Sequence, residues 1–511
     1  MVRMVRTMAR GRTAVGARRW RAFPLAALLL AFVPGGSAAS TSGSADRQGG
    51  AAQPAPSPAA MGPVWPKLTA AERDDVMQFG EDFKQFMGVS KSELFFVREA
   101  RQFAERHGFT PWRPSLRADE VTPGSRWYAV NRDRTIALFV IGRRPMTDGA
   151  RIVNSHIDAV RIELKTKPFR TSQDIALLDT QVHGGLKNYQ WVNRPLALIG
   201  RIDKTDGTTV WVDIGHGADD PVLLIPDLAP HVDADYRERK NRDVIRTEEL
   251  DPLLGMAMEA ALEVLRSRYG VTSDDLLSAE LQLVPAQMPV DIGLDRQLVG
   301  AYGHDDRSNG YASLRAIAEV ETPDRTAIAY AVNNEEVSSW TTGVNSEWFS
   351  TLFAEIVAVQ ATGTYSDLML RHALAASQVL VSDCTTAVNP LFPGMQLPGA
   401  AARLGWGLVF KEYGSGREAD SEYMAEVRAI LDAAGVRWQT HSYQAGYGGG
   451  TIAQWFANAN MDAIDVGIGI LSMHSPFDVS AKVDLWELYR GFRAFMTTSE
   501  ARLRAASGGR D

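Results

Sequence analysis

The sequence predicts an α/β protein in which a mixed, mostly parallel sheet is flanked by helices and interrupted by an inserted β-rich domain. After residue 303, strand-like and helix-like segments alternate, which is typical of a parallel sheet with crossover helices. Between residues 169 and 290 the pattern changes to short alternating strands and polar stretches, which indicates a separate unit. The length of 511 residues also favours more than one domain.

Two helices are expected where the folded chain begins, near residue 65. Thr69 and Glu72 form a capping-box pattern that opens a helix extending to about residue 87. Ser90 and Glu93 repeat the pattern and predict a second helix, which Gly108 ends. Strand-like runs follow at 127–130, 135–141 and 151–155. These elements make up the first part of the core domain, residues 63–168.

The insertion, residues 169–290, contains one clear hairpin signal. Residues 196–202 and 208–214 alternate apolar and polar side chains around a Lys-Thr-Asp-Gly turn. A helix is expected over 252–269 and a strand over 280–284.

The second part of the core domain, residues 291–511, alternates between the two kinds of element. The expected strands are 298–302, 326–332, 378–382, 436–442 and 463–468. The expected helices are 311–318, 419–434 and 485–503.

The first 39 residues differ from the rest of the chain. They carry seven arginines and no acidic residue, followed by a short apolar run at 23–33 and small residues at 37–39. This pattern predicts a secretory signal peptide, and the apolar run is too short to span a bilayer. Residues 40–62, rich in Ser, Gly, Ala and Pro, predict a flexible linker. The protein is therefore expected to be exported, to the periplasm or the medium, without a membrane span.

Charge and cysteine content exclude some classes of function. The net charge is −7, and it falls to −14 without the first 39 residues. Such an acidic chain is not expected to bind nucleic acid. Cys384 is the only cysteine, which excludes an intrachain disulfide and a Cys-rich zinc site.

Histidine and carboxylate side chains follow the predicted strands. Parallel sheets place their sites beyond the carboxyl ends of strands, so these side chains are expected to lie together. The set comprises His156, Asp158, Asp305, Asp306, Glu335, Glu336, Asp383 and His474. Taken one by one, such residues are more often helix caps or surface groups, and Asp305 and Asp306 fit an N-cap. Their joint occurrence at five strand ends favours a metal site.

The residue types point to a pair of metal ions. Zinc accepts histidine nitrogen and carboxylate oxygen, and two ions at one site share a bridging carboxylate and a hydroxide. The adjacent Glu335 and Glu336 suit a division of roles, in which one binds metal and the other takes a proton from the bridging water. Asp158, two residues after His156, suits the orientation of that imidazole.

These segments resemble the M18 family of zinc aminopeptidases, the group of aspartyl aminopeptidase and aminopeptidase I. Residues 154–158 (Asn-Ser-His-Ile-Asp) resemble the first His-x-Asp motif of the family. The other matching segments are 189–201, 305–314, 334–338, 382–390, 449–452 and 465–475. They follow the family's order between about residues 65 and 495.

The resemblance implies a zinc-exopeptidase-like catalytic domain in two parts, 63–168 and 291–511, with a dimerisation or oligomerisation domain inserted at 169–290. It implies two Zn²⁺ per subunit, with Co²⁺ or Mn²⁺ as an alternative in one site. The ligand sets it implies are His156, Asp305 and Asp383 for one ion, and Asp305, Glu336 and His474 for the other.

The implied activity is removal of the N-terminal residue from peptides with a free amino terminus. A metal-bridging hydroxide would attack, Glu335 would be the general base, and Asp158 would support His156. The family also implies a homo-oligomer built from dimers, up to a tetrahedral dodecamer.

Some positions depart from the aspartyl-specific branch of the family and leave the preferred residue open between acidic and neutral. Thr386 and Asn389 stand where that branch has histidines, and Tyr189 stands where its inserted domain offers one. Lys411 and Arg417 are candidate cations for an acidic side chain.

Two other functions remain as alternatives, a co-catalytic zinc acylase or dipeptidase and a catalytically inactive shell-forming homologue. Two histidines near these segments, His183 and His304, are not assigned to the site.

Overall fold

The computed structural model describes residues 62–337, 341–397, 399–412, 420–443, 448, 451–499 and 501. The expected signal peptide, nearly all of the expected linker, parts of the matching segments 334–338 and 449–452, and Arg417 lie outside these residues. Within the described part of the chain, no helix has both the length and the apolar character needed to cross a membrane.

A nine-stranded mixed sheet forms the centre of the fold, in agreement with the predicted fold class. Four neighbouring strands at its middle, β13, β4, β14 and β18, run parallel to one another. The strands, in spatial order, are β1 (Thr110–Pro111), β2 (Arg126–Asn131), β3 (Thr135–Val140), β13 (Thr326–Val332), β4 (Ala150–His156), β14 (Gln378–Ser382), β18 (Asp462–Gly467), β16 (Leu408–Glu412) and β17 (Trp438–Ser442).

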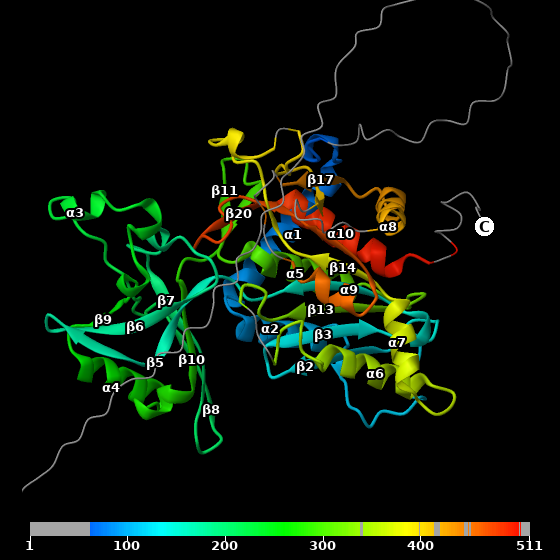
Figure 1. The fold of residues 1–511 in the computed structure, drawn as a ribbon, viewed down its shortest axis with the longest axis horizontal. Coiled ribbons are helices and arrows are strands. Elements are labelled where there is room, and N and C mark those ends of the chain that lie inside the picture. Colours follow the sequence, from blue (N-terminus) through cyan, green and yellow to red (C-terminus); the bar gives the residue numbers. More distant parts are fainter. Residues whose placement is uncertain are drawn as a thin grey trace, which may run out of the picture. The chain divides into compact units, whose positions relative to one another are not determined.

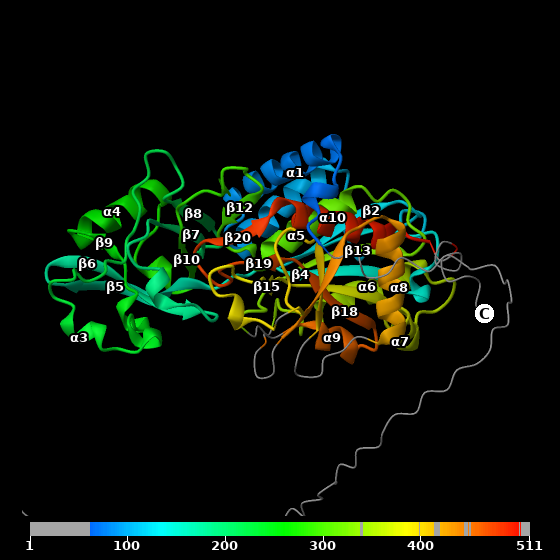
Figure 2. The same cartoon turned by 90° about the horizontal axis from the view of Figure 1, so that it is seen from above.

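Helices cover both faces of this sheet because its strand residues alternate between two apolar cores. Val153 and Ala329 belong to the core on one face, and their neighbours Ile152 and Tyr330 belong to the core on the other. Figures 1 and 2 show α1, α5 and α10 on one side of the sheet and α6 and α9 on the other. The α-helices outside the segment Arg161–Pro285 are α1 (Ala70–Val89), α2 (Glu93–Arg106), α5 (His304–Ala318), α6 (Trp348–Gln360), α7 (Asp367–Ala375), α8 (Ser421–Ala433), α9 (Ala453–Asn458) and α10 (Lys482–Thr497).

A second, six-stranded antiparallel sheet lies within the part of the chain from Arg161 to Pro285. Helices α3 (Ala234–Arg237) and α4 (Met258–Tyr269) belong to the same stretch of chain, drawn in cyan to green in Figure 1. The predicted hairpin is confirmed, because β7 and β8 pair from Leu198 with Ile214 to Asp203 with Thr209. The strands, in spatial order, are β8 (Thr209–Ile214), β7 (Leu196–Asp203), β10 (Ala279–Pro285), β5 (Arg161–Ser172), β6 (Ile175–His183) and β9 (Leu253–Gly255).

Two small sheets complete the fold. The three-stranded sheet is antiparallel and contains β11 (Val290–Ile292), β12 (Leu298–Ala301) and β20 (Asp478–Ala481). The two-stranded sheet pairs β15 (Thr385–Thr386) with β19 (Gly469–Ile470).

Several expected elements differ from the structure; for example, the helix expected over 485–503 is α10, which ends at Thr497. The strand expected at 298–302 is β12, which pairs with β11 and β20 in the small three-stranded sheet and is not part of the large sheet. The helix expected from 252 begins only at Met258, since residues Leu253–Gly255 pair with β6 as β9. The second capping box is wrong: Ser92, not Ser90, accepts the hydrogen bond from Phe95 N and caps α2.

The turn that leads into β4 depends on Gly149. Its φ is 87°, and a Cβ there would collide with the backbone carbonyl of Ala376. Gly149→Ala is therefore expected to lower the free energy of unfolding by about 2–4 kcal/mol, measured by urea denaturation. Gly363→Ala is the control, because a Cβ at that glycine meets no atom within 4 Å. Equal stability of the two variants would contradict the expectation.

Candidate metal centre

The parallel strands bring four predicted site residues to one edge of the large sheet. His156 is the last residue of β4 and is level with Val332, the last residue of β13. On its other side, Ser382 at the end of β14 pairs with Ser155 of β4 and with Val466 of β18. Asp383 follows at once, and the Glu335–Glu336 pair lies just beyond β13. The register of the parallel strands thus explains why these four residues lie at the same edge of the sheet.

The other two predicted metal ligands come from outside the large sheet. Asp305 lies at the start of α5, directly after β12, and is 5% exposed. His474 lies in the loop between β19 and β20, where its backbone has a φ of 63°. Since β12 pairs with β20, the small antiparallel sheet places these two residues beside each other.

Together the residues form two groups that share Asp305. His156, Asp305 and Asp383 each offer one atom within 4.8 Å of the others, and so do Asp305, Glu336 and His474. His156 Nε2 lies 3.1 Å from Asp305 Oδ1 and 3.7 Å from Asp383 Oδ1. On the other side, His474 Nε2 lies 3.4 Å from Asp305 Oδ2. One carboxylate therefore presents one oxygen to each group.

Both imidazoles have their second nitrogen held by an acceptor. His156 Nδ1 lies 3.1 Å from the backbone oxygen of Asp158 and 3.3 Å from its Oδ1. His474 Nδ1 donates to the backbone oxygen of Gly185 at 2.9 Å. These contacts place the proton on Nδ1 of each ring, which leaves Nε2 as the coordinating atom.

The carboxylates around the two rings change the pKa of each. Burial alone would lower the pKa of His156, but hydrogen bonds with Asp158 and Asp305 raise it well above its ordinary value. In the same way, contacts with Asp305 and Glu336 raise the pKa of His474 to about 11. The raised pKa values mean that each Nε2 binds a cation strongly, so a proton and a metal ion compete for it.

Asp158 organises the loop that carries the paired glutamates. Its fully buried carboxylate accepts the backbone N–H of Glu335 at 3.0 Å and that of Glu336 at 3.2 Å. Although burial opposes ionisation, hydrogen bonds from His156 and His183 hold the pKa of Asp158 far below its usual range. Asp158 is therefore an anion that connects both glutamates to His156.

Glu335 has the electrostatic character of a general base. Burial, opposed by His156 and reinforced by the negative charges of Asp383 and Glu336, raises its pKa to about 7. A carboxylate with such a pKa accepts and returns a proton near neutral pH.

The donor set fits zinc. Imidazole nitrogen and carboxylate oxygen are common zinc ligands, and each group supplies three of them, which leaves a position open for water or substrate. In addition, Glu336 Oε1 is buried, accepts no hydrogen bond, and lies 3.2 Å from His474 Nε2. Such an unsatisfied buried oxygen is expected where a cation belongs.

A third cluster, formed by Asp305, Asp306 and Cys384, is less suited to a metal. Burial and the neighbouring carboxylates raise the pKa of the Cys384 thiol well above its ordinary value, so it stays protonated. Asp306 Oδ1 accepts the backbone N–H of Cys384 at 3.1 Å, which is a structural contact.

Lys411, a candidate cation, and His304, which is not assigned to the site, both have structural partners. Lys411 is buried, and its Nζ lies 2.7 Å from Asp383 Oδ2 and 3.0 Å from the backbone oxygen of Cys384. It therefore supports a predicted metal ligand. His304 is fully buried, and its Nε2 lies 3.2 Å from the backbone oxygen of Val299, outside the two groups.

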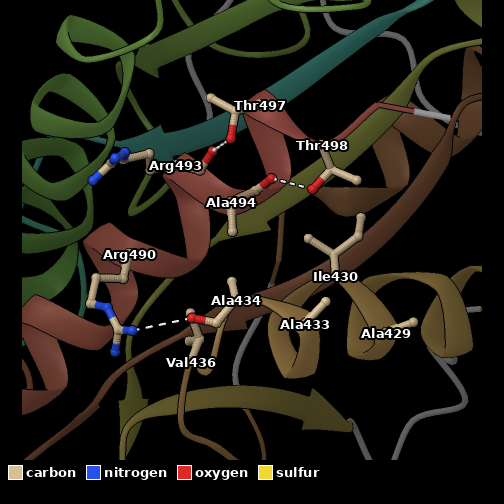
Figure 3. Close-up of a pocket in the computed structure, with 10 residues that line it drawn as sticks. All are labelled: Ala429, Ile430, Ala433, Ala434, Val436, Arg490, Arg493, Ala494, Thr497 and Thr498. Atoms are coloured by element: carbon tan, nitrogen blue, oxygen red, sulfur yellow. Dashed lines mark hydrogen bonds between the residues drawn. The ribbon is translucent and has the colours of Figure 1, made fainter. Parts of the chain in front are cut away.

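A cavity of about 290 Å³ between α8 and α10 is a poor candidate for a second site (Figure 3). Its lining contains no histidine, cysteine or carboxylate. Its two cations already have acidic partners, since Arg490 pairs with Glu487 and Arg493 with Glu319.

The chain is similar to known aminopeptidases over most of its length. Residues 86–496 match the family model described as "Aminopeptidase I zinc metalloprotease (M18)". A relative from Clostridium acetobutylicum, a probable M18 family aminopeptidase 1, is 36% identical over 455 residues, which cover 85% of this chain and 97% of the relative. A similarly described relative from Thermotoga maritima is 34% identical, and the match covers 83% of this chain and 97% of that protein.

Solved structures show the same similarity. The crystal structure of an M18 aminopeptidase from Thermotoga maritima matches with a TM-score of 0.80 and 32% identity, over 86% of this chain and 99% of that one. The structure of the S. cerevisiae mApe1 dodecamer matches with a TM-score of 0.70 over 84% of this chain and 97% of that one. At 21% identity, the latter supports the fold alone.

Proposed function

This chain belongs to the M18 family of zinc aminopeptidases, and we propose that it removes the N-terminal residue from peptides with two zinc ions and Glu335 as general base. The observation that carries the proposal is the shared carboxylate of Asp305. Its two oxygens lie 3.1 Å from His156 Nε2 and 3.4 Å from His474 Nε2. One residue is thus placed to serve both ligand groups.

Each ligand group would hold one ion. His156, Asp305 and Asp383 would bind the first, and Asp305, Glu336 and His474 the second. When bound, the pair supplies Lewis acidity, which polarises the scissile carbonyl and lowers the pKa of the attacking water toward neutrality.

Glu335 would move the proton of the reaction. Its pKa of about 7 allows its carboxylate to take a proton from the attacking water. The same group would then give that proton to the leaving amine. Asp158 would keep Glu335 in place through the backbone N–H that it accepts at 3.0 Å. The free α-amino group of the substrate would bind near the site's carboxylates, which restricts cleavage to chain ends.

Metal-dependent hydrolysis of aminoacyl p-nitroanilides tests this function. The panel contains Leu, Ala, Lys, Asp and Glu substrates, and the protein is assayed as purified, after chelation and after zinc or cobalt is restored. We expect turnover that chelation abolishes and zinc restores, and the preferred side chain would assign the specificity. Activity on N-acetyl amino acids alone would instead favour the acylase alternative, and a protein without bound metal would contradict the site.

We also propose that the chain forms a homo-oligomer through an inserted domain at residues 169–290. The S. cerevisiae neighbour is described as a dodecamer. In this chain the six-stranded unit exposes apolar side chains, including Val222 at 46%, Val264 at 46% and Leu277 at 54%. Light scattering on the purified protein measures the assembly, and a monomeric mass would contradict the proposal.

Export is a further proposal, supported by the basic and apolar composition of residues 1–39. The mass of the protein recovered from the producing cells and their medium tests it. A protein that keeps residues 1–39 and stays inside the cell would contradict export.

A further inference from the structure

We propose that the segment 183–185, here called the strap, is a positioning element for both metal groups, with His183 as its central residue. The strap is the end of β6 in the six-stranded sheet and the two glycines that follow it. It contacts the site at both of its ends. This inference rests on the proposed zinc site and adds to it a residue that sequence reasoning left unassigned.

At one end of the strap, His183 lies between two carboxylates. Its Nε2 lies 3.1 Å from Asp158 Oδ2, and its Nδ1 lies 3.1 Å from Glu163 Oε1. The side chain is 6% exposed, so water does not replace these partners. Because each nitrogen faces a carboxylate oxygen, the ring donates from both sides and fixes the orientation of Asp158.

Asp158 in turn contacts residues of the proposed site, so the orientation of its carboxylate affects them. The same carboxylate accepts the backbone N–H groups of Glu335 and Glu336 and lies 3.3 Å from His156 Nδ1. Without His183, a fully buried carboxylate would lose one of its donors, and its remaining contacts would hold its orientation less firmly. The expected result is a simultaneous shift of His156 and both glutamates.

At the other end, the backbone of the strap holds the second metal group. Gly185 accepts the hydrogen bond from His474 Nδ1 at 2.9 Å. The side chain of His474 is 34% exposed, so packing alone does not fix its ring. Gly184 has a φ of 75°, and a Cβ there would lie 2.7 Å from Val160 Cγ1 and 3.3 Å from Glu336 Oε2. The absence of side chains lets the strap lie against Glu336.

A purely structural role for His183 gives a different expectation. His183 pairs with Arg161 in the β5–β6 ladder, and its contact with Glu163 could simply join the two strands. In that case its removal would lower stability and leave the metal affinity and the chemical step of the folded enzyme unchanged. Metal affinity therefore separates the two roles.

The test compares His183→Ala and His183→Gln with Leu178→Ala in the full-length protein. Leu178 lies on the same strand, is 1% exposed and packs in the core of the six-stranded sheet. For each protein, Tm, zinc affinity by competition with a chromogenic chelator, and kcat and KM are measured. We expect His183→Ala to weaken zinc binding and lower kcat by about 10- to 100-fold with little change in KM.

The other variants distinguish a loss of positioning from a general loss of stability. His183→Gln should recover part of the loss, because its amide can still donate to Asp158. Leu178→Ala should lower Tm and keep the wild-type zinc affinity. Gly184→Ala should weaken zinc binding because its Cβ would disturb the contact of the strap with Glu336. If His183→Ala does not fold, Gly184→Ala is the variant that tests the strap.

Wild-type zinc affinity and kcat in His183→Ala, or an equal loss of affinity in Leu178→Ala, would overturn the inference. So would wild-type affinity in Gly184→Ala where His183→Ala does not fold. Failure of the proposed function would look different, because the unmodified protein would then lack zinc or turnover. If the unmodified protein binds zinc but shows no turnover, zinc affinity still tests the strap.

Discussion

Replacement of Glu335 by glutamine is expected to lower kcat by about 10²- to 10⁴-fold while bound zinc stays at the wild-type level. Glutamine keeps the shape of the side chain but accepts no proton, so only proton transfer is lost. In the proposed site Glu335 is not a ligand, because the two groups of candidate ligands contain Glu336 instead. Steady-state kinetics and metal analysis of the same sample measure both quantities.

The pH profile provides a second measure of Glu335. The base works when ionised, so activity should be lost as the pH falls through its pKa. Burial and neighbouring acids, opposed by His156, raise the pKa of Glu335 to about 7, and bound zinc ions would lower it. The acid limb of kcat is therefore expected at or below about pH 7. Glu335→Gln should lack this limb.

An exposed glutamate provides the control. Glu347 precedes α6, and its Oε2 accepts the hydroxyl of Ser350 at 2.7 Å. Glu347→Gln should keep wild-type kcat and the acid limb. Loss of zinc from Glu335→Gln would show that Glu335 is a ligand, and wild-type kcat in that variant would remove it from the mechanism.

Replacement of Asp305 by asparagine is expected to remove both zinc ions and with them all measurable turnover. Each ligand group depends on one Asp305 oxygen, and an amide offers a weaker, neutral oxygen on one side and an N–H donor on the other. Asn has nearly the shape of Asp, so the buried position should still be filled. The measurement is the amount of zinc per chain after dialysis.

Single-group variants are the comparison for Asp305→Asn. Asp383→Asn affects only the group of His156, and Glu336→Gln only that of His474. Each is expected to keep about one zinc ion per chain, against two in the wild type and none in Asp305→Asn. Retention of both ions by Asp305→Asn would contradict the shared-carboxylate arrangement.

Local patterns predicted much of the fold. The capping box at Thr69 is present as expected, because it depends on residues three apart in the chain. The hairpin of β7 and β8 follows likewise from alternation around a short turn. Two of the wrong predictions involve long-range pairing, since residues expected at the start of a helix pair with β6 as β9, and β12 pairs with β20.

The sequence by itself determined which residue types stand at the strand ends, and so the chemistry of the candidate site. The seven residues predicted to bind metal or to act in catalysis lie together, since parallel strands end at a common edge and β12 pairs with β20.

Only the tertiary structure decided which groups hold these residues in place. His183 reaches Asp158, and Gly185 reaches His474 across 289 positions of sequence. The physical reason is that such contacts arise where two separately packed sheets meet, and no local periodicity or spacing encodes that meeting.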